Sequence, residues 1–103
     1  RFIRAAFHRM NAVAGESEEE SVNQFFHLLA SVEMPRGSVV LPDGALEITI
    51  YSSCCNTDKG IYYYTTYDHR EITGINMHLE NLEANEVICY SLVKDLVIKM
   101  KNG

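Results

Sequence analysis

The chain has 103 residues, of which 47% are hydrophobic and 22% are charged, and its formal net charge is −5. This length suffices for one domain and is too short for two, and no apolar run approaches the ~20 residues of a membrane-spanning helix. Nucleic-acid-binding proteins need a basic face, and the basic residues here are few and scattered. We therefore expect neither nucleic acid nor a membrane as a partner.

Cysteine and histidine usage argues for a reducing compartment and against a metal centre. The chain has 3 cysteines, two of them adjacent, and such a set is a poor disulfide framework. This pattern fits the cytoplasm, where we expect the protein to reside. The cysteines and histidines show no metal-ligand spacing, and no phosphate loop or dinucleotide fingerprint is present. We therefore expect neither a metal nor a cofactor.

Two helices are predicted at the start of the chain. A three-to-four spacing of apolar residues predicts a first helix with one buried face, formed by Phe2, Ile3, Ala6, Phe7, Met10 and Val13. Gly15 follows this stripe and is expected to end the helix. Ser17 and Glu20 match a capping box. They predict a second helix over residues 18–32, which ends before a turn at residues 35–37.

The chain then changes to a strand pattern. After a turn at residues 42–44, apolar and polar residues alternate over 46–50, which predicts a half-buried strand. A turn at residues 56–60 leads to a returning strand at 61–67, and a third strand is predicted at 72–77. Helices followed by an antiparallel meander define an α+β fold.

The pattern leaves alternatives open beyond Met77. Residues 78–83 fit either a loop or one helical turn, and residues 87–92 fit either a fourth strand or part of a terminal segment. The segment 93–99 is ambiguous in its register.

The residues by themselves define no self-contained active site. Cys54 and Cys55 have no histidine near them in sequence to serve as the base that a cysteine nucleophile needs. Cys89 lies in an apolar run and is interpreted as core, and the histidines are interpreted as structural or solvated. The tyrosine run within 62–67 is expected to pack between sheet layers, part of it buried with hydrogen-bonded hydroxyls, in preference to stacking on a ligand.

Four blocks of the sequence resemble one protein family. Residues 1–7, 21–32, 47–52 and 62–67 are similar, in order and spacing, to the C-terminal part of the choloylglycine hydrolase family. This family contains bile salt hydrolases and penicillin V acylases. The similarity extends to about Leu92 and therefore covers nearly the whole chain.

The resemblance implies a fold and an activity. Family members are N-terminal nucleophile hydrolases with a four-layer αββα sandwich, in which an N-terminal cysteine attacks a linear amide bond and its α-amino group is the base. Residues 1–103 would be a C-terminal fragment of that single hydrolase domain. The parent would cleave conjugated bile acids and form a homo-oligomer, by resemblance a tetramer. Neither Cys54 nor Cys55 can replace the missing nucleophile, so the fragment alone is expected to be inactive.

One catalytic residue follows from the resemblance. Arg1-Phe2 matches the last two residues of a Ser-Arg-Phe segment whose arginine lies near the nucleophile in the family. A guanidinium there would favour the thiolate. The alternative for Arg1 is a frayed, solvated terminus, and Arg4 is interpreted as a structural ion-pair residue.

Two other functions also fit the sequence. One is penicillin V acylase, which uses the same chemistry. The other is a stand-alone, non-enzymatic binding or assembly module in which the tyrosine-rich sheet would be an interface.

Overall fold

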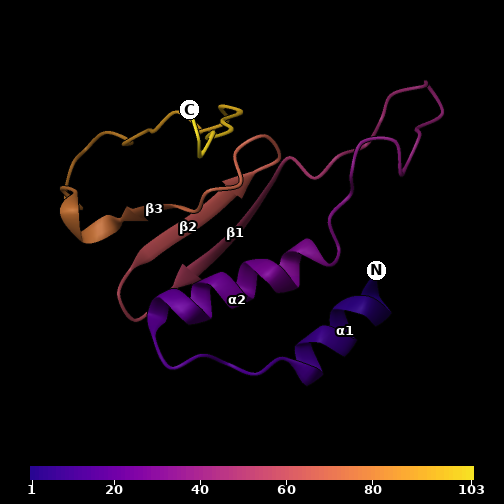
Figure 1. The fold of residues 1–103 in the computed structure, drawn as a ribbon. Coiled ribbons are helices and arrows are strands. Elements are labelled where there is room, and N and C mark those ends of the chain that lie inside the picture. The colour runs from indigo at the N-terminus through magenta and orange to yellow at the C-terminus, as the bar shows by residue number, and fades with distance from the viewer. The chain divides into compact units, whose positions relative to one another are not determined.

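A computed structural model describes residues 1–103 and confirms the predicted order of helices followed by strands (Figure 1). Its elements are α1 (Phe2–Asn11), α2 (Glu18–Ala30), β1 (Tyr51–Asn56), β2 (Ile61–Thr66), β3 (Thr73–Asn76) and the short 3-10 helix η1 (Met77–Leu79). The chain forms two compact units, residues 1–52 and residues 53–103. Neither helix has the length and apolar character that crossing a membrane requires.

Helix α1 ends earlier than predicted. The backbone of Ala12 is extended (φ −67°, ψ 140°), so the helix stops at Asn11 and Gly15 is not its cap. The predicted buried face is also wrong, because the apolar stripe has no cover within the chain. The exposed fractions of Phe2 and Ile3 are 84% and 82%.

The start of α2 largely follows the predicted capping box. The hydroxyl of Ser17 accepts a hydrogen bond from the backbone N–H of Glu20 at 3.1 Å. The Glu20 carboxylate accepts from the N–H of Glu16 at 3.0 Å, one residue earlier than the reciprocal bond of an ideal box. Gly15 lies against this pair, and a Cβ added there would collide with the Glu20 side chain.

The remainder of the first unit contains the two predicted turns. Gly37 and Gly44 take positive φ values of 102° and 86°, which glycine adopts at little cost. The predicted strand at 46–50 is wrong, since Leu46 forms only an isolated bridge with Val40. The backbone after Leu46 forms hydrogen bonds with other segments instead. The N–H of Thr49, for example, donates to the carbonyl of Met34 at 3.1 Å.

A meander is present as predicted, but its first strand is β1 (Tyr51–Asn56), which follows the predicted segment 46–50. Strands β1, β2 and β3 form one sheet in that order, and β2 and β3 pair antiparallel with Tyr63 opposite Gly74. The turn before β2 ends at Gly60, whose φ is 68°. It is fixed by the Asn56 side chain, which accepts from two backbone N–H groups at 3.1 Å each.

The open alternatives after the sheet are now decided. Residues 77–79 form one helical turn, and the Asn76 side chain caps it by accepting from His78 N–H at 3.0 Å. Residues 87–92 form no strand, and residues 93–99 lie in no helix or strand. In the whole chain only Tyr64 and Thr66 are buried, with exposed fractions of 4% and 6%.

Candidate functional site

Arg1, the one residue for which the sequence suggests a catalytic role, lies at the N-cap of α1. Its carbonyl accepts the first helical hydrogen bond, from Ala5 N–H at 2.9 Å. Its side chain is exposed, and Nη2 donates to the carbonyl of Val32 at 2.9 Å. Arg1 is thus exposed, as a solvated terminus would be, and its guanidinium makes one hydrogen bond to the chain.

Arg4 contacts the neighbouring acceptor. Its Nη1 donates to the carbonyl of Ser31 at 3.2 Å, so the prediction that Arg4 is an ion-pair residue is wrong. Ser31 is the C-cap of α2, where helix carbonyls lack intrahelical donors and the helix dipole favours a cation. Two guanidinium groups thus bond two consecutive carbonyls at the end of α2.

The Arg1 guanidinium at this end of α1 is a cationic hydrogen-bond donor. An arginine carries five N–H donors, and Arg1 uses a single side-chain bond, to Val32, with no carboxylate partner in the chain. The remaining donors are free to stabilise an anion, such as a thiolate or the oxyanion of acyl transfer.

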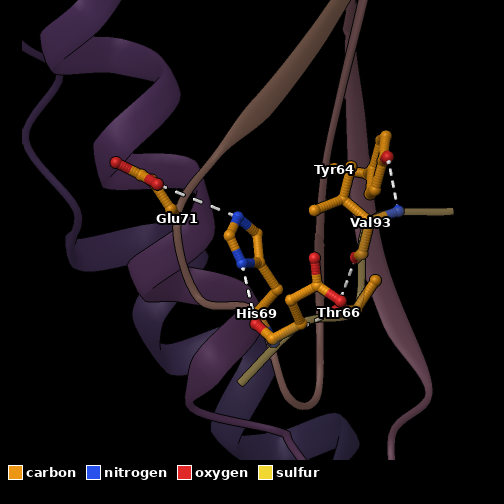
Figure 2. A network of polar contacts seen from close by, with 6 residues as sticks. Tyr64, Thr66, His69, Glu71 and Val93 are labelled. Atoms are coloured by element: carbon orange, nitrogen blue, oxygen red, sulfur yellow. Dashed lines mark hydrogen bonds and ion pairs between the residues drawn. The ribbon is translucent and has the colours of Figure 1, made fainter. Parts of the chain in front are cut away.

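A second polar cluster lies in the other unit, on β2 and the turn after it. The hydroxyl of Tyr64 accepts from Val93 N–H at 3.1 Å, and the hydroxyl of Thr66 donates to the Val93 carbonyl at 3.0 Å. Figure 2 shows both side chains directed at this one residue. The expectation of a buried tyrosine with a bonded hydroxyl is confirmed for Tyr64.

His69 extends this cluster. Its backbone N–H donates to the hydroxyl of Thr66 at 3.1 Å, and its Nδ1 lies 3.1 Å from the carbonyl of Asp95. Its Nε2 lies 3.8 Å from the Glu71 carboxylate (Figure 2). The contacts to Val93 and Asp95 connect the C-terminal segment to the sheet, which is a structural arrangement. The sequence gives no signal for the cluster, apart from two hydroxyl residues at alternate positions of one strand.

The thiols lack the environment of a nucleophile. All three cysteines are free, and Cys55 and Cys89 are exposed, so the interpretation of Cys89 as a core residue is wrong. Burial, and secondarily the neighbouring Cys55, raise the pKa of the Cys54 thiol, which keeps it in the unreactive protonated form. The structure contains no group of three or more histidine, cysteine, aspartate or glutamate side chains that could hold a metal ion.

Sequence comparison identifies relatives of this chain. The model of the family described as linear amide C-N hydrolases, choloylglycine hydrolase family, matches residues 1–90. A bile salt hydrolase/transferase of Lactiplantibacillus plantarum is 49% identical over 92 residues, which are 89% of this chain and 28% of that protein. A bile salt hydrolase/transferase of Clostridium perfringens is 40% identical over 102 residues, which are 99% of this chain and 31% of that protein.

Structure comparison agrees with these matches. Two crystal structures of variants of the conjugated bile acid hydrolase from Clostridium perfringens match with a TM-score of 0.83 each, at 40% sequence identity. The match covers 98% of this chain and 31% of each of those chains. The two helices and the three-stranded antiparallel sheet are thus also found in that hydrolase.

The fold and the sequence match define the class of this chain, that of the linear amide C–N hydrolases. Within this class it belongs to the choloylglycine hydrolase family. The chain spans less than one third of the length of the relatives described here, with 28% and 31% covered.

Proposed function

We propose that this chain is the C-terminal part of an amidase that cleaves the amide bond between a bile acid and glycine or taurine. The observation that carries the proposal is the 49% identity over 92 residues to a protein named bile salt hydrolase/transferase. Residues 1–103 would then form part of a single four-layer αββα domain. The nucleophilic cysteine would come from a part of the polypeptide outside these residues.

Arg1 is the residue that we assign to the chemistry. Its support is the family motif together with the free donors of its guanidinium, since only one bond, to Val32, is made. A fixed cation next to a cysteine lowers the pKa of the thiol, and a donor aimed at the reacting carbonyl oxygen stabilises the charge that develops there. Arg1 would therefore act on the nucleophile and the oxyanion and would not itself form a covalent bond.

The relatives' names favour conjugated bile acids over penicillin V as the substrate. The relatives from Lactiplantibacillus plantarum and Clostridium perfringens are both named for bile salts, and a Lactobacillus acidophilus relative, 30% identical over 90 residues, is named conjugated bile acid hydrolase. For the parent protein we also propose a cytoplasmic location and a homotetramer. Light scattering would test the assembly state.

A hybrid enzyme tests the proposal. In it, this chain replaces the matched segment of the Clostridium perfringens bile salt hydrolase/transferase, which aligns with 99% of the chain. The hybrid should release glycine from glycocholate and taurine from taurocholate. A folded hybrid without amidase activity would favour a non-enzymatic module.

The catalytic role of Arg1 is tested in the same hybrid. We expect Arg1→Gln to lower kcat by about 100-fold or more, the magnitude typical of losing one oxyanion donor. Arg9→Gln is the matched control, because Arg9 is another guanidinium of α1 and makes no hydrogen bond or ion pair in the structure. Equal activities of the two variants would remove Arg1 from the mechanism. The chain alone, incubated with the same conjugates, should release no amino acid.

A further inference from the structure

We propose that Arg4 is a positioning residue for Arg1. By bonding the Ser31 carbonyl, Arg4 fixes the first turn of α1 on the last turn of α2, and this orients the Arg1 guanidinium. The inference rests on the proposed function, because it concerns a residue that acts through Arg1.

The first support is the geometry of the two arginines. Arg1 and Arg4 are three residues apart, so their side chains lie on one face of the helix start. Their acceptors, Val32 and Ser31, are consecutive, at donor–acceptor distances of 2.9 Å and 3.2 Å. Matching pairs of this kind define the direction of one helix end relative to the other, whereas a single bond would leave it free to pivot.

The second support comes from the other carbonyls at the end of α2, which already have donors. The Leu28 carbonyl accepts from the Ser31 hydroxyl at 2.6 Å. The carbonyls of Leu29 and Ala30 accept from the next backbone N–H groups, those of Val32 and Glu33, at 3.1 Å and 3.2 Å.

The acceptors that remain are the two that the arginines contact, the carbonyls of Ser31 and Val32. The pair of arginines therefore completes the hydrogen bonding at this helix end. Since the other carbonyls at this helix end already have donors, only the carbonyls of Ser31 and Val32 are left for the arginines, which makes the pairing specific.

The third support is the different freedom of the two residues. Arg1 is the N-cap, outside the helix proper, while Arg4 lies within α1. A long side chain on a terminal residue has many rotamers, and one exposed hydrogen bond selects weakly among them. Arg4, whose backbone is helical, fixes the distance between α1 and the acceptors, and this keeps the Val32 carbonyl within reach of Arg1.

Kinetics of the hybrid enzyme test the inference. Arg4→Gln should lower kcat between about 10-fold and 100-fold, the effect of a small misplacement of a catalytic group, with KM changed less than about twofold. Arg4→Lys, which keeps a cationic donor, should recover part of the loss. Arg9→Gln should leave both constants unchanged.

A double-mutant cycle separates positioning from general stabilisation. If Arg4 acts through Arg1, then Arg4→Gln should have no further effect on kcat in a protein that already carries Arg1→Gln. Full multiplication of the two losses would overturn the inference. A fall in apparent kcat that is fully explained by a smaller folded fraction, at a lower melting temperature, would also overturn it.

A crystal structure of the Arg4→Gln hybrid decides the case independently of activity. A displaced or disordered Arg1 guanidinium supports the inference, and an Arg1 that still bonds the Val32 carbonyl contradicts it. A hybrid that cleaves no conjugated bile acid would overturn the proposed function, yet this structure would still settle whether Arg4 positions Arg1.

Discussion

Thr66→Val removes the hydroxyl that connects β2 to the C-terminal segment while keeping the shape of the side chain. The hydroxyl donates to the Val93 carbonyl at 3.0 Å and accepts from His69 N–H at 3.1 Å. The variant leaves that carbonyl without its donor, but His69 N–H retains a second acceptor, the Thr66 carbonyl at 3.2 Å. Because one bond is lost fully and one partly, we expect unfolding to require about 1–2 kcal/mol less free energy.

Urea denaturation of the hybrid enzyme measures this loss, and hydrogen exchange locates it. Exchange should accelerate in the segment around Val93 and remain unchanged in α2. Thr65→Val is the matched control, since Thr65 is the adjacent residue of β2 and makes no side-chain hydrogen bond in the structure. Equal stability of the two variants, or unchanged exchange near Val93, would refute the argument that the hydroxyl anchors this segment.

Two further predictions concern a turn and a thiol. Gly60→Ala should destabilise the protein by about 1–2 kcal/mol, because φ there is +68° and the new Cβ would approach His78 Nε2 to 2.8 Å. Gly44→Ala, where φ is +86° and nothing lies within 4 Å, should cost less in the same denaturation assay. Iodoacetamide at pH 8 should alkylate Cys55 before Cys54, since burial raises the Cys54 pKa; mass spectrometry after partial alkylation would expose the opposite order. Because burial disfavours the Cys54 thiolate in the folded state, the free energy of unfolding should be unaffected by this thiol below its unfolded pKa of about 8.5 and should fall as pH rises above it.

The sequence predicted those elements whose causes are local. The serine at the N-cap determines where α2 begins, and a run of β-branched and aromatic residues determines β2. The segment 46–50 also has a strand pattern, an alternation of apolar and polar residues, yet it is not a strand. Its backbone N–H groups donate to the carbonyls of Met34 and Val39, which precede it in the chain. A pattern within one segment cannot specify which partner that segment takes.

The polar contacts of the two candidate clusters were less predictable than the elements. Arg1 bonds a carbonyl 31 positions away, and Tyr64 and Thr66 bond a residue 29 and 27 positions away. These acceptors and donors are mainly backbone groups, which every residue possesses, so no residue type marks them in the sequence. Arg1 was found only because it falls within a family motif.

The structure changes how the two interpretations of Arg1 relate to each other. From the sequence, a solvated terminus and a catalytic cation were alternatives. The bond to the Val32 carbonyl occupies one donor on Nη2 and holds the side chain at the end of α2, where the partial negative charge favours a cation. A guanidinium has four further N–H donors, so an anchored Arg1 can still face an anion. The bond to Val32, supported by the bond from Arg4 to Ser31, restricts the side chain before any substrate arrives, and such preorganisation is what makes a charged donor effective in catalysis.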